Sequence, residues 1–154
     1  MKTLKDILPL HPFWKNLAPA YRDLLLGCAA IEHYHAGEPI FRKGNDADHF
    51  YLIHTGKVAL ETPYTPGNGM ITIQTLGGGE VLGWSWLFPP YRWHFGAKAV
   101  DATEAIVFKA EAVRVAAREN PAFGYDLAIQ VGGILLERLQ STRMRLLETC
   151  EVAA

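Results

Sequence analysis

The sequence predicts an α+β fold, in which an antiparallel β-roll or jelly roll (a double-stranded β-helix) is flanked by N-terminal helices and a long C-terminal helix. Between residues 31 and 109, short alternating or apolar runs are separated by turns such as KGNDAD, TGK, PGNG and GGGE, which is typical of antiparallel strands. From residue 110 onward, apolar residues recur every three to four positions, as in amphipathic helices. A chain of 154 residues, 49% of them hydrophobic, can bury one core, so we expect a single domain over residues 1–154.

The predicted elements follow in order along the chain. The segment LAPAYRDLLLGCA has apolar residues at helical spacing behind a proline, which predicts two short helices within residues 11–30. Residues 31–109 form the β-roll, and HFGAKAVDATEAIVFK supplies its last two strands. Residues 110–148 form the C-terminal helices: AEAVRVAAREN predicts a helix that ends before Pro121, and one long helix follows it.

The long helix has one apolar face, formed by Leu127, Val131, Ile134, Leu135, Leu139 and Leu146. Gly132 and Gly133 lie in its middle and cost about 1 kcal/mol each relative to Ala, either as tolerated weak points or as places where another backbone or a ligand comes close. A long amphipathic helix beside a small roll leaves apolar surface exposed, so we expect a homodimer through Phe123–Glu148. The alternative is a helix folded back onto its own roll.

Composition excludes several classes of function. The net charge of −1 predicts no general attraction to nucleic acid or to an anionic membrane. No apolar run reaches the length of a membrane span, and the N-terminus lacks a signal-peptide pattern, so we expect a cytoplasmic protein. Cys28 and Cys150 are far apart and outside any CxxC pair, which argues against a metal or redox role. Without a nucleophile elbow, P-loop or dinucleotide fingerprint, we expect no catalytic residue and no enzyme.

Three segments together resemble a known family. HAGEPIFRKGNDADHFYLIHTGKVAL has Gly37, Gly44 and Gly56 at its turns, GEVLGWSWLF follows, and ERLQSTR lies on the long helix. From about His11 to Leu147, this arrangement resembles the cyclic-nucleotide-binding domain of the cyclic-AMP receptor protein and Fnr type of regulator. The resemblance implies the β-roll, a dimer helix, and a role in signal transduction similar to that of a transcription regulator.

The resemblance also implies a phosphate-binding cassette, here residues 79–99, whose Glu binds the ribose hydroxyl and whose Arg pairs with the cyclic phosphate. Gly83 matches the glycine of that pattern, but Trp84 stands at the Glu position and Trp93 at the Arg position. Each charge-assisted hydrogen bond contributes about 1.5–3 kcal/mol, so losing both weakens binding by roughly a hundredfold to ten-thousandfold. We therefore expect weak or absent binding of cyclic AMP, and the ligand candidates are a cyclic nucleotide or another small molecule.

The cassette leaves two questions open. Arg92 either swings into the pocket and binds an anion or points to solvent, since a shift of one residue along a strand turns a side chain to the other face. Trp84, Trp86, Tyr91 and Trp93 either line a pocket for a flat or apolar ligand or fill the pocket as core.

Two hydroxyls are further candidates for ligand binding. Ser85 could donate a hydrogen bond to a ligand oxygen, or it could cap the short helix that the resemblance implies. Thr142 falls about where the dimer helix of the resembled family contacts the purine ring.

Histidines permit a third interpretation. His33 and His35 point to one face of a strand and precede Glu38, which resembles the cupin metal motif, with His94 in position to be a further ligand. The Glu spacing does not match that motif, so the interpretation as exposed strand histidines is favoured over a metalloenzyme or a haem sensor, and we expect no metal site.

The length of the C-terminal region bears on which partners this chain can bind. About seven residues follow Leu147, too few for a helix-turn-helix domain, so we expect no DNA binding by this chain alone. Either the protein is a stand-alone sensor, with a protein partner as one option, or a DNA-binding part lies outside this sequence. The leading hypothesis is a regulatory sensor module with a diverged pocket. The alternative is a genuine cyclic-nucleotide binder that uses Arg92 and backbone amides, and the third is a cupin-like metalloenzyme.

Overall fold

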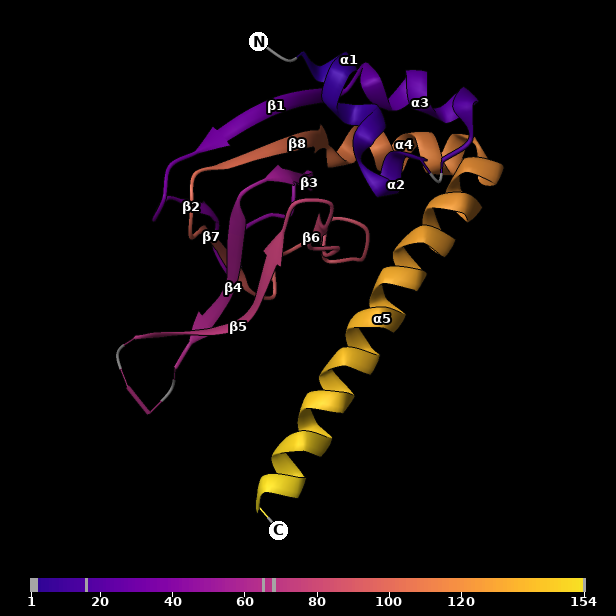
Figure 1. Cartoon of the computed structure of the whole chain (residues 1–154). Coiled ribbons are helices and arrows are strands. Elements are labelled where there is room, and N and C mark those ends of the chain that lie inside the picture. The colour runs from indigo at the N-terminus through magenta and orange to yellow at the C-terminus, as the bar shows by residue number, and fades with distance from the viewer. Residues whose placement is uncertain (1–2, 16, 65, 68, 154) are drawn as a thin grey trace.

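The computed structural model describes residues 3–15, 17–64, 66–67 and 69–153, and it confirms the predicted fold class. N-terminal helices, two facing antiparallel sheets and a long C-terminal helix follow one another along the chain (Figure 1).

The N-terminal helices are α1 (Leu4–Ile7), the 3₁₀ helix η1 (Leu8–Leu10), α2 (Pro12–Lys15) and α3 (Pro19–Leu26). Prolines begin α2 and α3, where the missing N–H is not needed. The helices start earlier than the predicted residue 11, and the first strand starts at Ala29 rather than at residue 31. The segment LKDILPL gives only single turns, too short for a recognisable helical period.

Within the described residues, eight strands form the β-roll. They are β1 (Ala29–Tyr34), β2 (Pro39–Phe41), β3 (His49–Thr55), β4 (Lys57–Pro63), β5 (Met70–Gly77), β6 (Val81–Leu82), β7 (Gly96–Ala99) and β8 (Thr103–Lys109). One sheet has the order β1-β8-β3-β6 and the other β2-β7-β4-β5, with antiparallel neighbours throughout. The last two strands agree with the prediction for HFGAKAVDATEAIVFK.

Buried side chains from both sheets form the core, among them Leu52, Leu60, Leu82 and Ile106. The turn between β3 and β4 shows why the sequence needs a glycine there. Gly56 has a φ of 105°, and a Cβ on it would lie 2.5 Å from Thr103 Oγ1. The motif TGK therefore fixes the close approach of β3–β4 to the start of β8.

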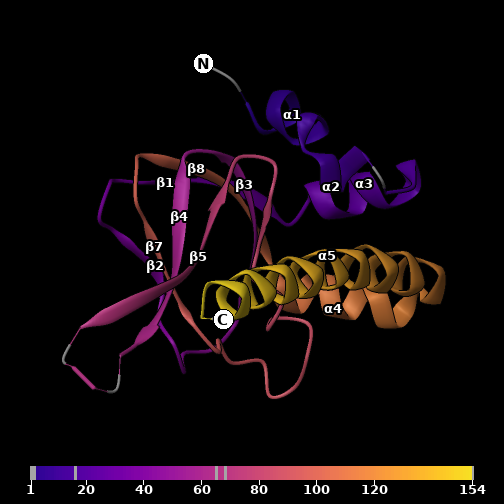
Figure 2. The ribbon, with the colours of Figure 1, turned by 60° about the horizontal axis from the view of Figure 1, so that its bottom comes forward.

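The C-terminal helices are α4 (Ala110–Glu119) and α5 (Pro121–Ala153), which agrees with the predicted break before Pro121. The first turns of α5 bury Phe123, Leu127 and Val131. Farther along, α5 leaves α4 and passes the open side of the roll (Figures 1 and 2). Large apolar side chains there stay exposed, including Leu136 at 56% and Leu146 at 63%. The outer half of α5 therefore keeps an apolar face that its own roll does not cover.

No helix in the described parts of the chain is both long enough and apolar enough to span a membrane.

Candidate functional site

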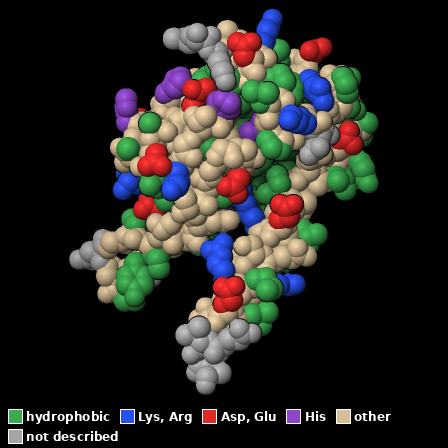
Figure 3. Space-filling model, viewed as in Figure 1, with side chains coloured by type: hydrophobic (Ala, Val, Ile, Leu, Met, Phe, Trp, Pro, Cys, Tyr) green, Lys and Arg blue, Asp and Glu red, His purple; other side chains and the backbone are tan. Residues whose placement is uncertain are grey.

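A cavity of about 630 Å³ lies between the β-roll and α5. Strands β2, β4 and β5 supply one wall, the cassette supplies a second, and one face of α5 supplies the third. Figure 3 shows the hollow between the roll and the projecting half of α5, with basic and acidic side chains around it. This volume is in the usual range for small-molecule sites.

Six of the eight predicted site residues line this cavity. They are Gly83, Trp84, Ser85, Trp93, His94 and Thr142. The cassette supplies the first five and α5 supplies the last, so segments about 50 residues apart in sequence meet at one space.

The resemblance implies that Trp93 stands at the position of the family's phosphate-binding arginine. Its ring stacks on Phe41 with 3.8 Å between the ring centroids and 10° between the planes, and it is almost fully buried. Gly83 has a φ of 80°, and a Cβ on Gly83 would lie 2.6 Å from Trp93 Cζ3. The indole therefore fills the space beside the glycine turn, and only glycine fits next to it.

Two neighbouring residues keep a polar point on the cavity wall. Ser85 is buried, and its Oγ lies 3.1 Å from Nδ1 of His94, which is exposed. Trp84 is half-buried and presents its ring to the cavity. This part of the cassette is lined by aromatic residues but is not filled.

The structure contradicts the expectation that Arg92 lines the pocket. Arg92 Nη1 donates to the Gly44 carbonyl at 3.1 Å and lies 3.5 Å from Asp46 Oδ1, and its side chain is 59% exposed. Residues 92 and 46 form a β-bridge, so the segment is extended here and alternate side chains point to opposite sides. Trp93 points inward and Arg92 therefore points outward.

Trp86 is also not a residue of this cavity. It is fully buried and stacks on Phe50 with 4.5 Å between the ring centroids. The Leu87 amide donates to the Trp84 carbonyl at 3.0 Å, so the segment forms a helical turn. Residues two apart on a helical turn face opposite sides, which sends Trp84 to the cavity and Trp86 to the core.

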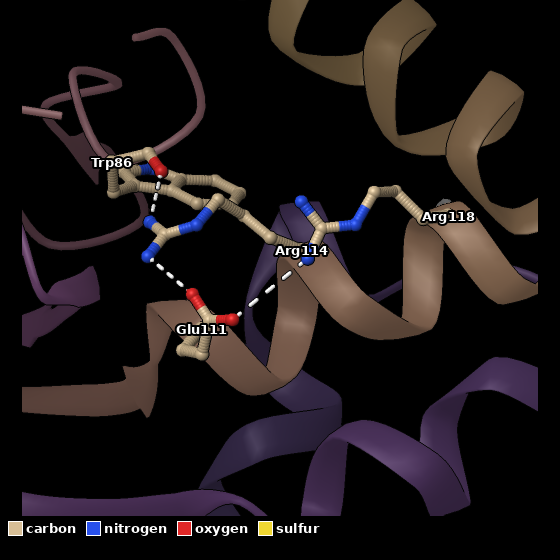
Figure 4. A network of polar contacts seen from close by, with 4 residues as sticks. All are labelled: Trp86, Glu111, Arg114 and Arg118. Carbon is tan, nitrogen blue, oxygen red and sulfur yellow. Dashed lines mark hydrogen bonds and ion pairs between the residues drawn. The ribbon is translucent and has the colours of Figure 1, made fainter. Parts of the chain in front are cut away.

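An arginine of α4 contacts the cassette, and it was not identified in the sequence analysis. Arg114 Nη1 donates to the Trp86 carbonyl, and its guanidinium lies 4.2 Å from the centroid of the Tyr91 ring. Arg114 Nη2 also donates to Glu111 at 2.9 Å, and Arg118 lies 3.8 Å from the other oxygen of that carboxylate (Figure 4). These contacts tie the cassette to α4.

Arg138 of α5 is the second residue that sequence reasoning missed. It lines the cavity, its guanidinium lies 4.7 Å from the Trp84 ring centroid, and its Nη2 donates to the Val81 carbonyl. Burial lowers the pKa of Arg138, and the nearby Glu80 and Glu137 oppose that shift. A signal was present in ERLQSTR, because Arg138 precedes Thr142 by four residues and so lies on the same helix face.

The histidines give no metal centre. No group of three or more His, Cys, Asp or Glu within the described residues is arranged to hold a metal ion. The His33 side chain is 72% exposed, and the Glu38 carboxylate accepts the His35 backbone N–H at 2.8 Å. The cupin interpretation therefore finds no support in this geometry.

Comparison with known proteins agrees with this architecture. The family described as cyclic nucleotide-binding domain matches residues 31–120. This chain belongs to that family, and the resemblance seen in its motifs is confirmed.

A cyclic AMP receptor protein from Thermus thermophilus is 30% identical over 135 residues, which cover 88% of this chain and 60% of the relative. The chain thus spans about 60% of the length of that curated relative. The solved catabolite activator protein of Thermus thermophilus has a TM-score of 0.67 and 30% identity over 88% of this chain and 61% of its own. A cyclic nucleotide-binding domain from Methylobacillus flagellatus has a TM-score of 0.75 and 20% identity, covering 86% and 74% of the two chains, and shows the same fold.

Proposed function

We propose that this chain is a non-enzymatic regulatory sensor that binds a small ligand other than a cyclic nucleotide in the cavity beside α5 and dimerises through that helix. One observation carries the proposal. A cavity of about 630 Å³ stays open between the cassette and α5, although Trp84 and Trp93 line it where the resemblance implies the family's two polar anchors.

Loss of the anchors argues against cyclic nucleotides. The Trp93 ring is held by its stack on Phe41, and an indole ring cannot compensate for the desolvation of a phosphate. Arg92, the nearest replacement in sequence, is engaged with Gly44 and Asp46 away from the cavity. Loss of two charge-assisted hydrogen bonds, at about 1.5–3 kcal/mol each, removes most of the affinity of a micromolar ligand.

Calorimetric titration of the purified protein with cyclic AMP and cyclic GMP tests this part. We expect a Kd of about 0.1 mM or weaker for both nucleotides, which is a micromolar affinity reduced a hundredfold or more. Micromolar binding would overturn the proposal, because the missing anchors would then have been replaced by other groups.

The exposed face of α5 supports the dimer. Along it, residues recur at alternating spacings of three and four, the period of a coiled coil: Ile129, Gly132, Leu136, Leu139, Arg143, Leu146 and Cys150. The large apolar members of this row, which we call the α5 seam, are exposed. Leu139 belongs to both the α5 seam and the cavity wall. A ligand that contacts Leu139 can therefore favour one arrangement of the two helices over another.

Cys150 is an internal probe of the dimer. It is exposed and continues the α5 seam, and in a parallel dimer in register it faces its own copy. We expect mild oxidation to give a disulfide-linked dimer in the wild type and in Cys28→Ser, but none in Cys150→Ser, as read on a non-reducing gel. A protein that sediments as a monomer would contradict this part of the proposal.

A further inference from the structure

The cavity contains one guanidinium with incomplete hydrogen bonding. Nη1 of Arg138 is fully buried and has no hydrogen-bond partner among the described residues. Nη2 of the same group has the Val81 carbonyl as its acceptor. A buried N–H without an acceptor is costly, and Arg138 lines the cavity, so a ligand acceptor that this group reaches by a small shift of its side chain is favoured.

The surroundings of Arg138 leave its charge available. No described carboxylate lies within ion-pairing distance of the guanidinium; Glu80 and Glu137 act on it only at longer range. Its face rests on the Trp84 ring, a cation–π contact that orients the group without neutralising it. Among the described residues that line the cavity, none is Asp or Glu.

The remaining wall is mainly apolar. Phe41, Trp93, Phe95, Leu135 and Leu139 surround the space with aromatic and aliphatic surface. The pair formed by Ser85 and His94 is a second polar point, from the cassette side. The cavity therefore offers a large apolar surface together with a single positive charge.

We propose that the ligand is an aromatic or otherwise apolar molecule that carries one carboxylate-like anionic group, with the anion on Arg138 and the apolar body against Trp84 and Trp93. This inference rests on the proposed function, since it names the ligand class of the same cavity. A nucleotide fits less well, because among the described residues Arg138 is the one arginine or lysine on the wall and most of the remaining surface is apolar.

A series of naphthalene compounds with the same ring and a two-carbon side chain, but with head groups of different charge, provides the test. Calorimetry on the full chain compares 1-naphthaleneacetate, 2-(1-naphthyl)ethanol and 2-(1-naphthyl)ethylamine at pH 7, which share the ring and are an anion, a neutral molecule and a cation. We expect the anion to bind about 10- to 100-fold more tightly than the alcohol, the range of one charge-assisted hydrogen bond, and the amine to bind most weakly.

Variants of Arg138 test whether this residue causes the preference for the anion. Arg138→Gln is expected to abolish the difference between anion and alcohol while the affinity for the alcohol stays unchanged, which also shows that the cavity is intact. Arg138→Lys keeps the charge and is expected to retain part of the preference. Arg145→Gln, a matched change on an exposed part of α5, is expected to retain all of it.

Two results would overturn the inference, and they have different meanings. Equal affinity for the three naphthalene compounds would refute the anionic anchor while leaving the open apolar cavity in place. No binding of any of them, together with micromolar binding of cyclic AMP, would refute the proposed function itself.

Discussion

The cassette has a packed side and an open side, and the two differ in what their tryptophans contact. On the packed side, Trp86 stacks on Phe50 and is fully buried, whereas Trp93 is buried in its stack on Phe41 but also lines the cavity. On the open side, Trp84 is half-buried and shares the cavity with Arg138. Tryptophans within ten residues of one another thus serve two physical purposes, core packing and cavity lining.

The two sides differ in how their tryptophans use the space beside the glycine turn. Trp93 fills that space in its stack on Phe41, whereas Trp84 forms an aromatic wall of the cavity. The positive charge in the cavity comes from a different element, α5, through Arg138. Under the proposed function, these residues keep the cavity open and favour a ligand other than a cyclic nucleotide.

The largest expected effect is a difference in stability between a substitution on the packed side and one on the open side. Trp86→Ala removes a fully buried indole and is expected to lower the free energy of unfolding by about 3–5 kcal/mol. Trp84→Ala is expected to cost less than half of that, because its ring is only half-buried. Urea denaturation followed by circular dichroism measures both, and equal losses would mean that the two sides are packed alike.

A second prediction concerns a buried histidine beside the N-terminal helices. His11 is 3% exposed, its Nδ1 accepts the Phe13 N–H, and burial of the imidazole lowers the pKa of His11 to about 4 from 6.5. The unfolded chain therefore takes up a proton below pH 6.5 that the folded chain takes up only near pH 4. Stability from this group is complete above pH 6.5 and is lost as the pH falls toward 4, by about 2–3 kcal/mol.

Urea denaturation at a series of pH values measures how the free energy of unfolding changes with pH. His11→Gln is expected to be less sensitive than the wild type between pH 6.5 and 4, whereas the exposed control His35→Gln is expected to follow the wild type. If the free energy of unfolding falls equally between pH 6.5 and 4 in all three proteins, His11 is not the cause of that fall.

The smallest effect concerns the link between the packed side and α4. Arg114→Ala removes the donor to the Trp86 carbonyl and the guanidinium above Tyr91, and is expected to cost about 1.5 kcal/mol. Arg118→Ala removes an exposed partner of the Glu111 carboxylate, which Arg114 also contacts. This change is expected to alter the free energy of unfolding by less than about 0.5 kcal/mol. Thermal unfolding of both variants compares them, and equal small effects would show that α4 does not hold the cassette.

The sequence predicts the fold class because glycine turns and a change of period mark the elements locally. It also identifies six cavity residues, since a family pattern fixes their spacing. It does not separate Arg92 from Trp93 or Trp84 from Trp86, because the direction of each side chain depends on whether the backbone is extended or helical at that residue. Arg138 was missed because its contact with Trp84 forms only when α5 passes the roll.

The central claim is that the space beside the cassette is open and apolar. A fluorescence titration with 1-anilinonaphthalene-8-sulfonate, an aromatic anion, tests it most directly when the wild type is compared with Ile73→Trp, which enlarges a partly exposed side chain on the cavity wall. We expect one saturable site per chain in the wild type and loss of that site in the variant. Absence of saturable binding to the wild type, or equal binding to both proteins, would contradict it.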